Sequence, residues 1–141
     1  MTFKILSNSL YSESLEADPI AKEFDLLDNE VSAFTEHRAS IKFVTMNDDE
    51  AKVYFEHPDV ENYWVDLKYT LKEGNVEHLY RNRFAYISYN SSFPVQIGSP
   101  LLEDAGVQKI EDRESLQNII KKVVAEKSFE RSLLKAKKGT R

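Results

Sequence analysis

The chain has 141 residues, of which 41% are hydrophobic and 30% are charged, and it contains no cysteine. This composition is typical of one globular domain over residues 1–141 and excludes a disordered tail or a coiled coil. The lack of cysteine excludes disulfides, cysteine-ligated zinc, iron–sulfur clusters and thiol catalysis. The apolar runs are too short to cross a bilayer and no signal-peptide core follows Met1, so we expect a cytoplasmic protein without a membrane partner.

Charge is distributed unevenly along the chain. Residues 1–61 contain 5 Lys or Arg against 14 Asp or Glu, whereas residues 113–141 contain 9 against 3. The formal net charge of the whole chain is −5. This pattern predicts either two surfaces of opposite sign or a chain that neutralises itself, with residues 131–141 as a basic tail that can extend from the domain.

The first predicted elements are a strand over residues 2–7 and a helix that begins at Asp18-Pro19. Residues 8–17 between them fit either a loop or a short helix. The helix of about five turns is predicted from an apolar stripe at three- and four-residue spacings. The stripe comprises Ile20, Phe24, Leu27, Val31 and Phe34. The acidic residues of this helix, Glu23, Asp25, Asp28 and Glu30, lie off the stripe, where we expect solvent.

From Ile41 the apolar period changes to two, which indicates β-strands. We expect a strand over residues 41–44, a turn at residues 47–49 and a further strand through Val53 and Phe55. The clearest strand covers residues 63–71, where the odd-numbered residues are all apolar or aromatic.

A hairpin follows this strand, and its turn fixes the pairing. With Gly74-Asn75 as the turn, Asp66 pairs with Arg83, whereas a turn at Glu73-Gly74 pairs Asp66 with Arg81. The returning strand is predicted to run to Tyr89 with a bulge near residue 82.

The last third of the chain predicts a loop, a short edge strand near residues 95–97, a helical turn near residues 101–104 and a helix capped by Asp112. The apolar stripe of that helix stops at Lys127, so the helix either bends near Ser128 or leaves the domain. We therefore predict an α+β fold: an antiparallel meander sheet of four to six strands, packed by an N-terminal helix and a long C-terminal helix.

The sequence contains no motif that predicts a catalytic residue, a metal site or a cofactor. Its three histidines, His37, His57 and His78, lack the spacing of metal ligands. Adjacent carboxylates fall in predicted turns, where they are normally solvated, and acid–base catalysis needs two of them at a fixed distance in a cleft.

The single tryptophan, Trp64, falls on the polar face of its strand together with Asp66, Arg81 and Arg83. One interpretation is a cation–π contact beneath an arginine. The other is an exposed Trp–Arg patch, which has the composition of binding hot spots. The second interpretation predicts a small non-enzymatic regulatory or inhibitory protein that acts by binding another protein.

Two alternatives involve the end of the chain. The basic residues Arg131, Lys135, Lys137, Lys138 and Arg141 fit a nucleic-acid-binding protein that contacts phosphates, although they do not share one helical stripe. The order of elements also resembles that of helix-grip folds, which enclose a ligand cavity between the sheet and the last helix. That resemblance implies a small-molecule pocket lined by Tyr69, His78 and Tyr80.

Overall fold

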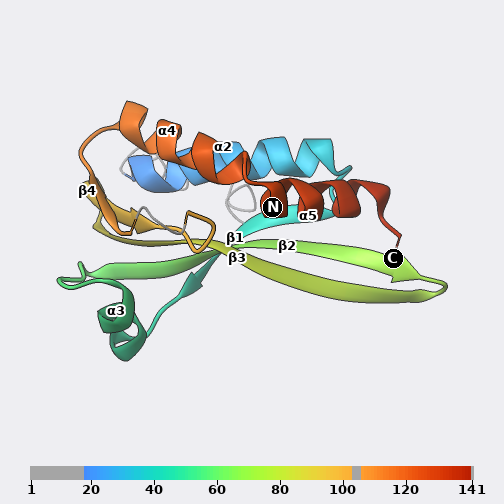
Figure 1. The fold of residues 1–141 in the computed structure, drawn as a ribbon, viewed down its shortest axis with the longest axis horizontal. Helices are drawn as coiled ribbons and strands as arrows, with labels where there is room; N and C mark the ends of the chain where they lie inside the picture. The colour runs from blue at the N-terminus through green and yellow to red at the C-terminus, as the bar shows by residue number, and fades with distance from the viewer. Residues whose placement is uncertain (1–17, 103–105, 141) are drawn as a thin grey trace, which may run out of the picture.

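The computed structural model describes residues 18–102 and 106–140, so the expected strand over residues 2–7, the segment 8–17 and Arg141 lie outside the described residues. Its elements, labelled as in Figure 1, are α2 (Pro19–Phe34), β1 (Ala39–Thr45), α3 (Asp48–Tyr54), β2 (Glu61–Glu73), β3 (Val76–Asn90), β4 (Ser92–Gly98), β5 (Gln108–Ile110), α4 (Arg113–Val124) and α5 (Lys127–Lys138). The strands form one antiparallel sheet in the order β1-β2-β3-β4-β5. This confirms the predicted α+β fold with an antiparallel meander sheet.

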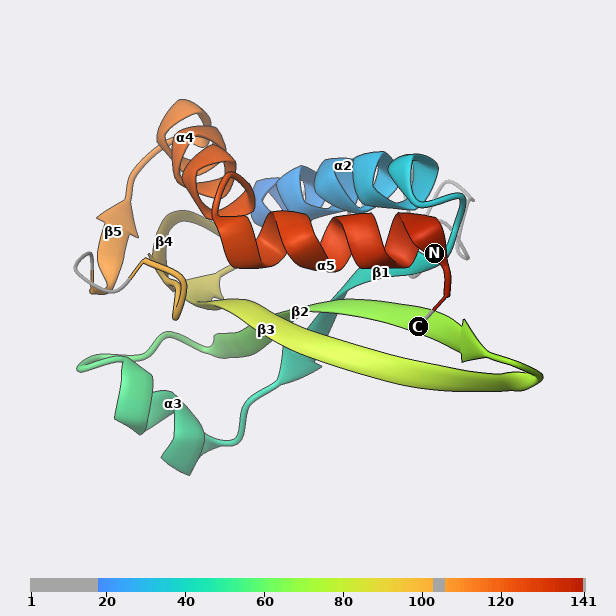
Figure 2. The ribbon, with the colours of Figure 1, turned by 45° about the vertical axis from the view of Figure 1, so that its right-hand side comes forward.

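The sheet has helices on both sides. Helices α2, α4 and α5 lie on one side and α3 lies on the other (Figure 1, Figure 2). The main hydrophobic core lies on the side of the three helices, and a smaller cluster of Met46, Ala51, Phe55 and Trp64 lies on the side of α3. The outer part of the β2–β3 hairpin extends beyond α3 and is covered on one side only (Figure 2).

Helix α2 begins as predicted. Oδ1 of Asp18 accepts a hydrogen bond from the Ala21 backbone N–H at 2.9 Å, and the helix ends at Phe34. The first four residues of the predicted stripe are buried, but Phe34 is 42% exposed. Its ring instead contacts the Lys137 ammonium group, 4.4 Å from the ring centroid, so the predicted burial of Phe34 is wrong.

The expectation that the acidic residues of α2 lie in solvent is wrong for three of them, because Glu23, Asp25 and Asp28 are buried. Glu23 accepts hydrogen bonds from Arg113 and Gln117 of α4, each at 2.8 Å. Charged hydrogen bonds of this kind offset the cost of burying a carboxylate, so Glu23 joins two helices instead of facing water.

Asp28 protects the exposed edge of the sheet. β1 is an edge strand, and its Ile41 N–H donates to Oδ1 of Asp28 at 2.8 Å, while its Ala39 N–H donates to Oγ1 of Thr35 at 3.0 Å. Unpaired edge N–H groups cost stability when buried and attract foreign strands when open. Two side chains from the region of α2 therefore close part of this edge.

Replacing Asp28 with alanine is expected to lower the free energy of unfolding by about 1–2 kcal/mol, because the Ile41 N–H loses its acceptor in a buried position. Asp28→Asn keeps an acceptor oxygen, so its free energy of unfolding is expected to fall by less than that of Asp28→Ala. Urea denaturation of both variants measures the difference, and equal losses would show that the hydrogen bond contributes nothing.

The predicted strand through Val53 and Phe55 is wrong, because residues 48–54 form α3. Asn47 and Glu50 make a capping box: the Asn47 side chain accepts from the Glu50 N–H at 2.8 Å, and the Glu50 carboxylate accepts from the Asn47 N–H at 3.2 Å. Both backbone donors at the helix start are thus satisfied locally, which favours a helical turn here.

The β2–β3 hairpin has the first of the two predicted registers. Glu73 pairs with Val76, so Gly74 and Asn75 form the turn, and Asp66 pairs with Arg83. The register shifts between Val65 and Asp66, which leaves residue 84 of β3 as the extra residue of a bulge. The bulge lies two residues beyond its predicted place.

The expected single C-terminal helix is two helices, α4 and α5, separated at residues 125–126. The break is physically reasonable because the buried residues of α4 do not continue onto the face of α5 that packs on the sheet, where Phe129, Ser132 and Ala136 are buried. The carbonyl oxygen of Gly139, just after α5, accepts from the Lys72 N–H at 3.0 Å. The strand expected near residues 95–97 is part of β4. The next strand, β5, was not predicted from the sequence.

Candidate functional site

The residues expected to bind a partner share the side of the sheet that faces away from α2, α4 and α5. Asp66 pairs with Arg83, Lys68 pairs with Arg81, and alternate residues of a strand point to the same side. Beyond α3, this side carries Lys42, Asp66, Lys68, Lys72, Glu77, Leu79, Arg81 and Arg83, which we call the basic sheet face. Basic residues outnumber acidic ones on it, and Asp66 is buried.

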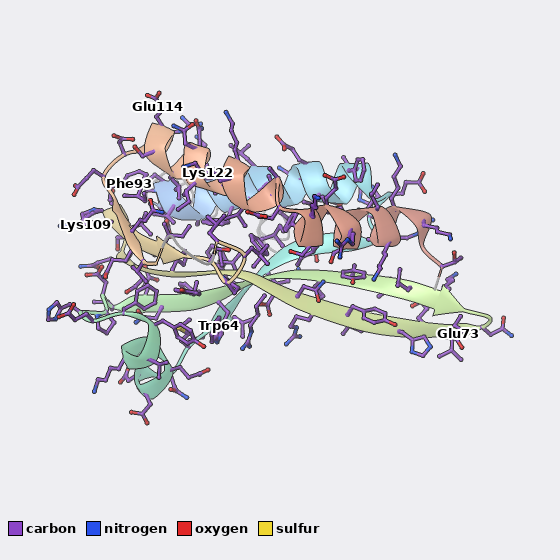
Figure 3. All side chains as sticks on the ribbon, viewed as in Figure 1. Trp64, Glu73, Phe93, Lys109, Glu114 and Lys122 are labelled. Carbon is purple, nitrogen blue, oxygen red and sulfur yellow. The ribbon has the colours of Figure 1, made fainter. Side chains whose placement is uncertain are left out.

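Trp64 lies on the α3 side of the sheet, next to the basic sheet face (Figure 3). It is only 7% exposed. Its ring packs edge-on against Tyr54 of α3, with centroids 4.6 Å apart, and its Nε1–H donates to Glu50 at 3.3 Å. The guanidinium carbon of Arg83 lies 4.3 Å from the centre of the ring. The cation–π interpretation is thus confirmed, and the interpretation of Trp64 as an exposed ring is wrong because α3 covers it.

Gly98 makes room for this packing. A Cβ atom at this position would collide with the ring of Tyr86, which pairs with Gly98 across β3 and β4. Tyr86 in turn packs against Tyr54 and Trp64, with centroid distances of 4.8 Å and 6.1 Å. The aromatic rings near α3 therefore pack against one another in one cluster.

Asp66 is the centre of the basic sheet face, with a side chain that is 0% exposed. Its carboxylate oxygens lie 3.4 Å from Nε of Arg83 and 3.7 Å from Nε of Arg81. Burial raises the pKa of Asp66, and the two arginines, Arg83 more than Arg81, oppose that rise. The arginine side chains are themselves 42% and 49% exposed, so one buried carboxylate holds two guanidinium groups at the surface.

The described basic residues expected to bind nucleic acid lie on two sides of α5. Lys137 contacts the ring of Phe34, whereas Lys135 and Lys138 line a cavity between α5 and the hairpin. Arg131 is exposed on α5, and Arg141 lies outside the described residues. Of the four described residues, Arg131, Lys135 and Lys138 are four and three residues apart and so lie on one side of α5, whereas Lys137 lies on another side.

The cavity beside Lys135 and Lys138 has a volume of about 640 Å³. It is lined by Tyr69, Leu71, Tyr80, Asn82, Ser132, Lys135, Lys138 and Thr140. Tyr69 and Tyr80, two of the three predicted pocket residues, therefore both line the cavity. Their rings are stacked with centroids 5.4 Å apart. His78 does not line the cavity; its Nε2 lies 3.9 Å from Glu73 at the end of the hairpin.

Sequence reasoning missed the polar residues of this cavity. The Asn82 amide group donates to Ser132 at 2.6 Å and to the Tyr69 hydroxyl at 3.4 Å, which ties β3 to α5 and β2. Asn82 and Ser132 are 50 residues apart in the chain. The only signal was the position of Asn82 on the same strand face as Tyr80, which did not reveal a partner on the last helix.

Among residues 18–102 and 106–140, no group of three or more His, Asp or Glu side chains is placed to hold a metal ion. No helix of the same ranges has the length and apolar character needed to cross a membrane.

In comparisons with known proteins, no family model, no curated protein and no solved structure matches this chain.

Proposed function

We propose that this chain is a small non-enzymatic protein that regulates or inhibits another protein by binding an acidic surface of it through the basic sheet face. The observation that carries the proposal is the arrangement of Arg81 and Arg83, which are anchored on the buried Asp66 yet half exposed. The planar guanidinium group suits bidentate binding of carboxylates, and a fixed base lowers the entropy lost on binding.

A protein partner is favoured over nucleic acid by the neighbours of these arginines. Leu79, on the same face, is 56% exposed, and protein interfaces combine apolar side chains with arginines. Binding of single-stranded nucleic acid relies on exposed rings that stack with bases, whereas Trp64 is packed under α3.

The partner is expected to present Asp and Glu side chains to the basic sheet face, so that electrostatic attraction speeds association. A cytoplasmic location is part of the proposal, because a chain without cysteine suits a reducing compartment.

The test compares two tagged variants in cells of the native host. Asp66→Asn keeps both guanidinium groups, whereas Asp66→Asn/Arg81→Gln/Arg83→Gln removes them without leaving a buried charge behind. We expect the unchanged chain to co-purify an acidic protein, Asp66→Asn to recover less of it because the anchoring carboxylate is gone, and the triple variant to recover at least tenfold less than the unchanged chain. Lys121→Gln/Lys122→Gln on α4 is the control for loss of positive charge elsewhere and is expected to retain the partner.

Recovery of the partner should fall as salt is raised, because the attraction between exposed charges is screened. Equal recovery by both Asp66 variants would contradict the proposal. Recovery of nucleic acid, with loss of the co-purified material after nuclease treatment, would favour the nucleic-acid alternative instead.

A further inference from the structure

The cavity described above is distinct from the basic sheet face. It opens between α5 and the outer part of the β2–β3 hairpin, on the opposite side of the sheet from Arg81 and Arg83. Its volume of about 640 Å³ falls within the range of small-molecule sites. The proposed binding of a protein partner does not use it.

One wall of the cavity is aromatic. Tyr69 and Tyr80 are cross-strand neighbours with an interplanar angle of 16°, and Tyr80 is half-buried. A flat unsaturated ring can extend such a stack, as bases do on tyrosines of nucleotide-binding proteins. The Tyr69 hydroxyl oxygen accepts from Asn82, and a phenolic hydroxyl can also donate a hydrogen bond to a ligand.

The opposite wall is cationic. Lys135 and Lys138 are three residues apart on α5, so they share one side of the helix, and both line the cavity. The described residues that line the cavity include no Asp or Glu. The ammonium groups therefore favour an anion, and they are near enough on the helix to contact one multiply charged group.

The C-terminal end of a helix carries partial negative charge, which opposes anion binding. At the end of α5 this charge is reduced, because the Lys135 carbonyl accepts from the Gly139 N–H at 2.9 Å and the Lys137 carbonyl accepts from Arg38 at 2.8 Å. The three lysines of the last turn offset it further.

From this arrangement we propose that the cavity binds a nucleoside monophosphate, with the base stacked at Tyr80 and the phosphate at Lys135 and Lys138. The hydroxyl and amide groups that also line the cavity, from Asn82, Ser132 and Thr140, suit the sugar. A single-ring acid would fill only part of the volume, whereas a base, a sugar and a phosphate together use both walls.

The test is titration of the intact protein with adenosine, guanosine, cytidine and uridine monophosphates, followed by calorimetry and by amide chemical shifts. Adenosine alone and inorganic phosphate alone serve as fragments. We expect at least one monophosphate to bind at least tenfold more tightly than either fragment, with the shift changes centred on Tyr69, Tyr80 and Ser132.

Lys135→Gln/Lys138→Gln changes two exposed helical residues and is expected to weaken this binding at least tenfold. The control Lys121→Gln/Lys122→Gln removes the same charge from α4 and is expected to leave affinity unchanged. The Asp66→Asn/Arg81→Gln/Arg83→Gln variant is also expected to keep full affinity, which separates this proposal from the binding of a protein partner.

Three results would overturn the proposal: no saturable binding of any monophosphate, equal affinity for inorganic phosphate, or unchanged affinity in Lys135→Gln/Lys138→Gln. The second result would identify a simple anion site, in which the stacked tyrosines have a structural role only.

Discussion

Replacing Trp64 with alanine is expected to lower the free energy of unfolding by about 3–5 kcal/mol, the usual cost of removing a large buried aromatic side chain. Trp64 is the largest member of the small cluster that holds α3 on the sheet. Its loss removes the contacts to Tyr54 and Arg83 and leaves a cavity that a helix of 7 residues cannot close by itself. Urea denaturation followed by far-UV circular dichroism measures the change.

The matched control is Leu79→Ala, an exposed apolar residue on the neighbouring strand, for which a change within about 0.5 kcal/mol is expected. A cost below 1 kcal/mol for Trp64→Ala would mean that α3 does not depend on this ring. If the expected cost is found, loss of partner binding in Trp64→Ala reports damage to the fold, and only the arginine variants test the basic sheet face.

The elements predicted correctly are those with strong local signals. The start of α2 depends on Asp18 and Pro19, which are adjacent in the sequence, and the hairpin depends on Gly74-Asn75 between two alternating segments. These signals act over a few residues, so the helix start and the hairpin turn can be predicted without knowledge of tertiary contacts.

The errors arise where distant residues decide the outcome. Glu23 looks like a solvated residue of an amphipathic helix until Arg113, 90 residues later, donates to it. Val53 and Phe55 alternate like residues of a strand, yet the capping box at Asn47 fixes a helix and only Phe55 reaches the core. An alternating pattern over only three residues is weaker than a helix start whose backbone N–H groups are hydrogen-bonded by a capping box.

The sequence predicts which residues share the candidate site, but not how deeply each side chain is buried. The alternating pattern placed Trp64, Asp66 and Arg83 on one face, and the structure keeps them together. The exposure of Trp64 depends on α3, which forms where the pattern predicts a strand, so the sequence left both the cation–π contact and the exposed ring open. The complete burial of Asp66 beside its two arginines was not predicted.

The buried carboxylate leads to the last prediction. Arg81→Gln/Arg83→Gln is expected to lower the free energy of unfolding by about 2–4 kcal/mol at pH 7, because Asp66 then remains charged and unpaired in a buried position. The estimate lies toward the lower end for a broken buried ion pair because both arginines are half exposed. Thermal and urea unfolding of the double variant measure the loss.

Adding Asp66→Asn to this variant is expected to restore most of that stability, since the uncompensated charge disappears. The part that is not restored, about 1 kcal/mol, is assigned to the cation–π contact between Arg83 and Trp64. No recovery in the triple variant would show that the arginines stabilise the fold by some route other than Asp66.

The pH dependence has a defined sign. Burial raises the pKa of Asp66 above that of the unfolded chain, so the folded state binds the proton more tightly. The stability contributed by Asp66 is therefore fully present below the unfolded pKa of about 3.9 and is lost as the pH rises through the folded pKa. Loss of the arginines removes the groups that oppose the rise, so the deficit of Arg81→Gln/Arg83→Gln relative to the triple variant is expected to grow with pH above about 4. A deficit that is constant with pH would mean that Asp66 is not the group that the arginines compensate.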